Sequence, residues 1–503
     1  MELDRPRVPL LLGARLVVVD LDENAVVLAP PPPADPIADV AAAVRDALRF
    51  PLGGEPLEAL VSRGARATVV VEPPALPVPG SPSDPRRVAI AATLSELDRA
   101  GADFERQTLL VAGGLARRLG HRDLETLVPP DFARRFRGRV EVHDVESPEL
   151  VELVSGERPL RVNPLLTQAD VVVTVTAAET VLHGGVAALL AASGPESLRA
   201  ADADSLLETS ASGGWRLGVQ LETALARRVP LVGVSLTLGT PQLGGMLHGY
   251  PHDPAAVERI ASSRLRGLFG LLPGTVRRRV LRHLPSELAA LAVFAGPPSV
   301  AHAEALLRGV EARAATLEGR LDALCIGVPH ATPHLPREAP NPALAAYLGL
   351  GHALRLWRDG FPVVEGGTAI LLSRFRRRFP HPTQQPYRAL FQALRAGRRD
   401  PLDLAGAELA AAADSRALES YRTGRSCHPL LPFAEWAACQ PAIGRLGAVL
   451  VAGCRDAHAA RQLGFVPTHG VSAALAMAQA RTERPARIGF LLSPPYFPLR
   501  VSQ

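Results

Sequence analysis

Short runs of β-branched residues recur along this chain and alternate with stretches rich in alanine and leucine. The clearest runs are residues 67–71 (ATVVV) and 169–176 (ADVVVTVT), which have the length and the nearly continuous apolar character of buried strands. Further strands are expected over residues 108–112, 140–143 and 231–236, and a hairpin over 15–20 and 25–29. This alternation predicts an α/β fold with mostly parallel sheets and helices on both faces.

A second series of strands is expected after an arginine-rich helical stretch over residues 254–284. Its members are residues 291–294, 323–326, 368–372, 448–452 and 488–492. We therefore predict two α/β domains, residues 1–275 and 285–503, with a cleft between them.

The chain contains no lysine, so all 55 of its basic Lys/Arg residues are arginines. A Schiff base with a carbonyl substrate needs a side-chain amine and is excluded. Phosphate-binding loops of the GxxxxGK type and kinase chemistry are excluded for the same reason. No GxSxG, HExxH or GxGxxG motif occurs either, which leaves hydrolase and dinucleotide-binding interpretations without support.

The net charge and the cysteines limit the possible partners and the cellular location of the protein. A net charge of +5 over 503 residues is mild, so nucleic acid is not expected as a partner. The arginine runs Arg277–Arg279 and Arg374–Arg378 are accordingly interpreted as solvated faces. Four scattered cysteines without metal-binding spacing indicate reduced thiols in a cytoplasmic protein, and no metal site is expected. No apolar run is long enough to span a membrane, and the N-terminus lacks the pattern of a signal peptide.

Several segments occur in an order that is informative in itself. They are residues 47–60 (ALRFPLGGEPLEAL), 108–117 (TLLVAGGLAR), 161–170 (RVNPLLTQAD) with Gly184–Gly185 after it, 365–368 (EGGT), and Trp436 with Gln440. This order resembles the lactate racemase family, whose members use a nickel-pincer nucleotide. The resemblance implies a hydride that leaves the hydroxyl-bearing carbon and returns on the other face, with histidines acting as acid and base at the hydroxyl.

Most functional residues of that family are replaced here. Residues 72–77 (EPPALP) stand where the family has D-x-T-R-P, so its arginine is missing. Ala116 replaces a family histidine, and Ala187 replaces the lysine that anchors the cofactor. The family's Q-x-x-K has no counterpart near residues 327–348. The cofactor is therefore unknown, and a covalent nickel-pincer nucleotide is not expected in a chain without lysine.

The first candidate site is residues 176–185 (TAAETVLHGG), which follow a predicted strand. Ligands of open α/β sheets bind beyond the carboxyl ends of strands. We assign His183 as catalytic, Glu179 as substrate-binding, and Gly184 and Gly185 as cofactor-binding through their backbone N–H groups. A tight turn without function would leave the same pattern.

The second candidate site is residues 327–342 (GVPHATPHLPREAPNP). His330 is assigned as catalytic acid or base and His334 as substrate-binding. The five prolines equally suit a surface loop with solvated histidines. Trp436 is assigned as catalytic because it matches a family active-site residue, although tryptophan packs in cores more often.

Two functions remain open. The first is a lactate racemase-like racemase or epimerase of a small 2-hydroxy acid, with a remodelled site. The second is a non-catalytic relative that binds a small anion or a protein partner. No membrane association is expected for either.

Overall fold

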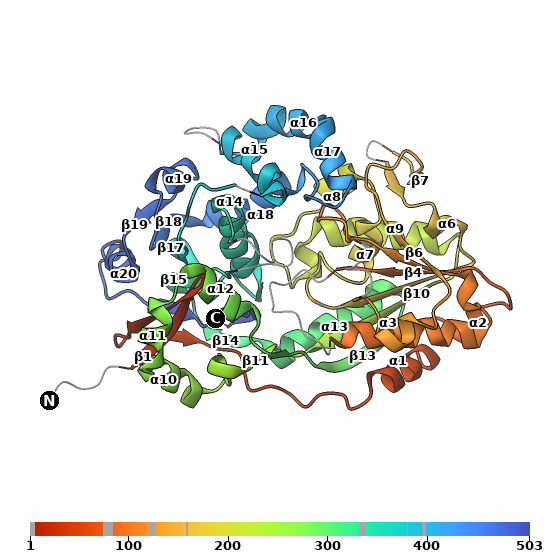
Figure 1. The fold of residues 1–503 in the computed structure, drawn as a ribbon, viewed down its shortest axis with the longest axis horizontal. Helices are drawn as coiled ribbons and strands as arrows, with labels where there is room; N and C mark the ends of the chain where they lie inside the picture. Colours follow the sequence, from red (N-terminus) through yellow and green to blue (C-terminus); the bar gives the residue numbers. More distant parts are fainter. Residues whose placement is uncertain are drawn as a thin grey trace.

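The chain folds into two lobes, each built around a six-stranded sheet (Figure 1). The structure is a computed structural model, and it describes residues 6–73, 84–120, 126–156, 159–330, 339–379, 381–394 and 399–502. No described helix is both long and apolar enough to cross a membrane.

The first sheet has the strand order β13-β10-β9-β4-β5-β6. Five of its strands are parallel, and β13 pairs antiparallel with β10 at one edge. Valine-rich segments form the centre because both of their faces are buried, which is typical of parallel sheets. The strands are β4 (Ala67–Val71), β5 (Gln107–Val111), β6 (Arg139–Val142), β9 (Val171–Ala177), β10 (Leu231–Leu238) and β13 (Ala290–Gly296).

Helices cover both faces of this sheet, as expected. One face packs against α1 and α3, and the other against α7, α9 and α13. These helices are α1 (Val40–Arg49), α3 (Pro85–Ala100), α7 (Val186–Ala191), α9 (Gly213–Ala226) and α13 (Pro298–Arg313). Smaller elements of this lobe are α2 (Leu57–Leu60), α5 (Pro130–Ala133), β7 (Val151–Val154), β8 (Leu160–Val162), α6 (Leu165–Gln168) and α8 (Pro195–Arg199).

The second sheet is parallel throughout, in the order β19-β18-β17-β15-β20-β3. One face packs against α14, α15 and α18, and the other against α20 and the β1–β2 hairpin. The strands are β3 (Val26–Leu28), β15 (Leu321–Gly327), β17 (Val363–Leu372), β18 (Leu446–Ala452), β19 (Val466–Thr468) and β20 (Ile488–Leu491). The hairpin is β1 (Arg7–Leu12) and β2 (Arg15–Asp20), and the helices are α14 (Pro342–Ala346), α15 (Gln385–Ala393), α18 (Leu431–Arg445) and α20 (Val471–Gln479).

Several small elements complete the second lobe. The helical stretch expected over residues 254–284 is present as α10 (Pro254–Ser262), α11 (Leu265–Leu271) and α12 (Gly274–Arg282). A separate three-stranded sheet consists of β14 (Ala315–Glu318), β21 (Leu499–Ser502) and β16 (Trp357–Arg358). The others are β11 (Gln242–Leu243), β12 (Ser286–Glu287), α16 (Ala405–Ala412), α17 (Ser415–Arg422) and α19 (Ala457–Gln462).

The chain crosses between the lobes more often than the sequence indicates. Residues 291–294 were expected to open the second strand series, and this is wrong: they lie in β13 of the first sheet. The expected hairpin of residues 15–20 with 25–29 is also wrong, because β2 pairs with β1 and β3 pairs with β20. Periodicity identifies a strand but not its partner, since backbone pairing carries no residue code.

Residues from the second half of the chain contact the first lobe at one end. Tyr421, of α17, packs with Leu115 and Val145 of the first lobe, and its hydroxyl donates to the Gly114 carbonyl. The buried His428 ring lies 3.0 Å from the Glu146 carboxylate through Nε2. These contacts join the two lobes at this end.

Candidate functional site

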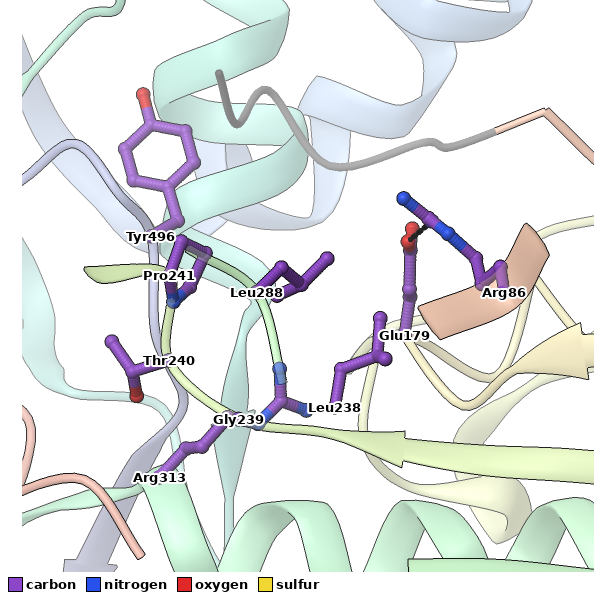
Figure 2. Close-up of a pocket in the computed structure, with 9 residues that line it drawn as sticks. All are labelled: Arg86, Glu179, Leu238, Gly239, Thr240, Pro241, Leu288, Arg313 and Tyr496. Atoms are coloured by element: carbon purple, nitrogen blue, oxygen red, sulfur yellow. Dashed lines mark hydrogen bonds and ion pairs between the residues drawn. The ribbon is translucent and has the colours of Figure 1, made fainter. Parts of the chain in front are cut away.

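A cluster of polar and charged side chains lies where three parallel strands of the first sheet end. Glu72 directly follows β4, Glu179 lies two residues beyond β9, and Thr240 lies two residues beyond β10. Carboxyl ends of neighbouring parallel strands meet at one sheet edge, which is where open α/β sheets bind ligands. Glu179 and Thr240 line one pocket there (Figure 2).

His183 is held between two buried carboxylates. Its Nε2 lies 2.7 Å from the Pro73 carbonyl and therefore donates to it. The other ring nitrogen, Nδ1, is buried and makes no hydrogen bond to a described residue; it lies 3.6 Å from Oε2 of Glu179 and 4.0 Å from Oε2 of Glu72. Burial raises the pKa of Glu72, while His183 and the Gly184 N–H oppose the rise. Nδ1 thus faces oxygens of both carboxylates.

Arg86 fixes the orientation of Glu179. It lies in the first turn of α3, where Asp84 caps the helix by accepting from the Arg86 N–H. The guanidinium is 2.7 Å from Asp84 and 2.6 Å from Oε1 of Glu179. Burial alone lowers the pKa of Arg86, but Glu179 and Asp84 outweigh burial and raise it. Two carboxylates therefore neutralise Arg86, and one of its ion pairs holds the Glu179 carboxylate.

Arg313 supplies the positive charge of the pocket. Figure 2 shows Glu179 and Arg86 on one side, Tyr496 and Pro241 on the other, and the Arg313 guanidinium near Gly239. Nε of Arg313 donates to the Gly309 carbonyl, and within the described part of the chain its other nitrogens make no hydrogen bond. Burial lowers the pKa of Arg313 to about 10, so the group stays charged at neutral pH.

The pocket is small in this conformation. The space between its lining side chains is about 20 Å³, room for one or two water molecules. Most of the lining comes from the first half of the chain, and Tyr496 comes from the end of the second sheet. Its hydroxyl donates to the Gly327 carbonyl, which ties Tyr496 to the second lobe. The pocket therefore lies between the lobes, and its width depends on how far apart they are.

Gly184 and Gly185 are required by close packing. Both have left-handed φ values, 100° and 55°. A Cβ at residue 184 would lie 2.5 Å from Cε1 of His302, and one at residue 185 would lie 2.6 Å from Cγ of the same ring. The Gly184 N–H donates to Glu72 and the Gly185 N–H to Oγ1 of Thr176. Both amides are therefore hydrogen-bonded within the protein. The cofactor-binding role expected for them stays a prediction, and a cofactor bound there would have to displace these hydrogen bonds.

His302, on α13, was missed by sequence reasoning. It is fully buried, donates through Nε2 to the Thr180 carbonyl at 3.0 Å, and its Nδ1 lies 3.3 Å from the Ser235 hydroxyl. Burial lowers its pKa to about 4, so the ring is neutral. Adjacent glycines signal a close neighbour, but no spacing identifies a residue more than a hundred positions away. Glu72 could have been found as a charge directly after a buried strand; Arg86 and Arg313 left no comparable signal.

Two other predicted site residues, His330 and Trp436, are described with surroundings of their own. His330 follows β15 and lies near Arg278 and Arg282, which together with burial lower its pKa to about 4. Trp436 is buried in α18, donates from its indole N–H to the Arg399 carbonyl at 2.7 Å and packs against Phe465. In the parts of the chain that are described, no hydrogen bond or ring contact joins Trp436 to the His183 cluster. His334 lies outside the described residues. Glu179, His183, Gly184 and Gly185 are thus brought together, while His330 and Trp436 have different surroundings.

The residues present do not fit the cofactor implied by the lactate racemase resemblance. Ala187, where the family has its anchoring lysine, is buried in α7 at 4% exposure, and the chain offers no side-chain amine. The neighbouring glycine backbone is closed by His302. Over the residues that the structure covers, no group of three His, Cys, Asp or Glu side chains is arranged to hold a metal ion.

The fold and the site define a two-lobed α/β protein with an acid–base cluster at the carboxyl edge of a parallel sheet. Residues 13–185 match the lactate racemase N-terminal domain. The lactate racemase apoprotein from Thermoanaerobacterium thermosaccharolyticum superposes with a TM-score of 0.60 at 14% identity, covering 98% of this chain and 100% of that one. A protein from Thermotoga maritima superposes with a TM-score of 0.51 at 10% identity, covering 93% and 99%. No curated protein matches in sequence. The chain thus resembles lactate racemase in fold over nearly its whole length, and in sequence over residues 13–185.

Proposed function

We propose that the chain is an isomerase, a racemase or epimerase, acting on a small 2-hydroxy acid in the pocket between the lobes. One observation carries the proposal. The Glu179 carboxylate lines that pocket, oriented by Arg86 and backed by His183, and Arg313 lines the same pocket. A 2-hydroxy acid has the two groups that such a pair recognises, a carboxylate and an adjacent hydroxyl.

Each residue then has a separate role. Arg313 binds the substrate carboxylate, since a guanidinium donates two parallel hydrogen bonds to that group. Glu179 accepts or returns the hydroxyl proton, because it lines the pocket. His183 is a positioning residue, since its buried Nδ1 faces Glu179 rather than the pocket. Inversion also needs an acceptor for the hydride of the hydroxyl-bearing carbon, which a nickel-pincer nucleotide supplies in the resembling family. Here a hydride-accepting cofactor bound without a covalent tether would have to supply it, taking up the hydride as Glu179 takes the proton and returning it to the other face.

The proposal requires the lobes to separate when substrate enters. A space of about 20 Å³ does not accommodate a hydroxy acid. Withdrawal of Tyr496 with the second lobe enlarges the pocket without disturbing the contacts of Glu179 with Arg86 and His183. We also propose a cytoplasmic location, in keeping with four cysteines that form no disulfide.

A panel of enantiopure 2-hydroxy acids, followed by chiral chromatography, tests the activity. Glu179→Gln is expected to lower turnover by about 100-fold or more, the usual effect of losing an acid–base group. Glu96→Gln is the matched control, because Glu96 also forms ion pairs, with Arg45 and Arg99, but away from the pocket. Wild-type protein that interconverts none of the acids, or equal activity of the two variants, contradicts the proposal.

The second candidate is a non-catalytic protein that binds a small anion. Arg313, which is charged and makes only one hydrogen bond to described residues, favours it, as does the lack of fit to the family cofactor. Calorimetry with lactate separates the two candidates. Binding that is lost in Arg313→Gln, kept in Glu179→Gln and accompanied by no interconversion supports the binding protein.

A further inference from the structure

The two arginine runs interpreted as solvated faces meet at the carboxyl edge of the second sheet. Arg374 lies two residues beyond β17, and Arg455 lies three residues beyond β18. The two loops are joined by backbone hydrogen bonds, from Ser373 N to the Ala452 carbonyl and from Arg455 N to the Phe375 carbonyl, both 3.3 Å. The run Arg374–Arg378 thus begins directly at the sheet edge.

The N-terminal hairpin brings a third arginine to the same place. Leu12 packs against Gly453: a Cβ added to this glycine would lie 3.0 Å from Cδ1 of Leu12. Likewise, a Cβ added to Gly327 would lie 2.7 Å from the Leu11 carbonyl oxygen. The hairpin therefore lies over the ends of β18 and β15. Arg15 starts β2 directly after the hairpin turn.

Helix α12 contributes the other arginine run, Arg277–Arg279. Phe269 of α11 and Leu281 of α12 pack in the same core as Leu10–Leu12 of the hairpin. Arg277 is buried, at 4% exposure, and donates to the Gly270 and Leu272 carbonyls. Residues of the hairpin, of α12 and of two strand ends therefore surround one region of the sheet edge.

Within the described parts of the chain, no carboxylate pairs with the four arginines that meet at this edge. The pKa of Arg374 is lowered to about 10, first by burial and then by Arg15, Arg376, Arg455 and Arg277. The pKa of Arg277 is lowered by burial and by two further arginines. Among the described residues Arg15, Arg277, Arg374 and Arg455 form no ion pair, and the nearby Asp456 lies 4.0 Å from Arg377. A solvated arginine face does not explain a buried Arg277 or a half-buried Arg374.

We infer that this edge of the second sheet is a binding site for a small molecule carrying a phosphate group with at least two negative charges. Guanidinium groups donate paired hydrogen bonds to phosphate oxygens. The carboxyl edge of a parallel sheet is the usual place for such a ligand. The site, defined by Arg15, Arg277, Arg374 and Arg455, is separate from the pocket of Glu179 and does not depend on the proposed isomerase activity.

Calorimetry of the full chain with pyrophosphate as the probe, at constant ionic strength, tests the inference. We expect one site per chain. Arg374→Gln should weaken binding about tenfold or more, the usual effect of losing a charged hydrogen-bond pair. Arg378→Gln, an exposed residue of the same run that is not among the arginines acting on Arg374, should change binding less than about twofold, because exposed charges are screened by salt.

A second readout separates binding from folding. Without ligand, Arg374→Gln should melt at the same or a higher temperature, because a like charge is removed. If this variant fails to fold, exposed Arg15→Gln replaces it and should also weaken pyrophosphate binding. Absence of wild-type binding, equal weakening by Arg378→Gln, or binding of single-stranded oligonucleotides without binding of pyrophosphate overturns the inference.

Discussion

The ring of His302 packs directly against the backbone of Gly185, with no room for a side chain between them. A Cβ on residue 185 would lie 2.6 Å from Cγ of the ring and 2.9 Å from the Pro298 carbonyl. The contact joins the segment that carries His183 to α13, a helix more than a hundred residues later. The position of His183 therefore depends on a packing contact with a residue that has no place in the pocket.

Gly185→Ala should destabilise the protein by about 2–4 kcal/mol, the combined cost of a left-handed backbone and of overpacking. Gly13→Ala is the matched control. Gly13 has a φ of 57° but nothing within 4 Å of an added Cβ, so its cost should be only about 1–2 kcal/mol. Urea unfolding measures both. Equal losses in the free energy of unfolding would show that the His302 ring moves aside at little cost.

The protein should carry no covalent nickel-pincer nucleotide, because it lacks the amine that would form the tether. Intact-mass spectrometry after co-expression with the enzymes that make the cofactor checks this expectation. A stable adduct of nucleotide mass would contradict it and would identify a different nucleophile.

Glu435 in α18 should make stability fall as pH rises. Burial raises its pKa to about 8, and the Tyr387 hydroxyl opposes the rise only in part. The unfolded chain has its ordinary value, near 4.5, so between these two values the folded protein binds more protons. Stability is therefore greatest below this window and is lost as pH rises through it, by at most about 1.4 kcal/mol per pH unit.

Urea unfolding of wild type and Glu435→Gln across this pH window measures the effect. The variant should gain in relative stability toward high pH. Glu419→Gln, on the exposed side of α17, serves as control and should run parallel to wild type. A Glu435→Gln profile parallel to wild type would contradict the assignment.

The contact between His428 and Glu146 should stabilise the docking of the two lobes. Nδ1 of His428 accepts from the Leu430 N–H, so the proton is on Nε2, which donates to Glu146 at 3.0 Å. His428→Ala should cost about 1.5–3 kcal/mol, the usual value for a hydrogen bond to a charged group. A double-mutant cycle with Glu146→Gln isolates the pair. Exposed His458→Ala should cost little, and strict additivity of the two substitutions would show that the pair contributes nothing.

Local pattern identified the strands of the first sheet and those of the second except β19 (Val466–Thr468). Valine runs such as residues 67–71 and 171–175 must be buried on both faces, and the stretches between them have the composition of helices. The same reasoning placed Glu179 and His183 at a sheet edge, because residues that follow parallel strands gather there. Neither result required knowing which strands are neighbours.

The sequence by itself determined the α/β class, most of the strands, and a polar cluster at the carboxyl edge of the first sheet. Only the tertiary structure decided that β13 completes the first sheet and that His302 occupies the space beside Gly184 and Gly185. It also packed Trp436 against Phe465 and brought together arginines from residues 15, 277, 374 and 455. The physical reason is that backbone pairing and side-chain packing depend on shape and burial, which many distant segments satisfy equally well. Periodicity predicts only the secondary structure and the buried face of each segment, not its neighbours in the fold.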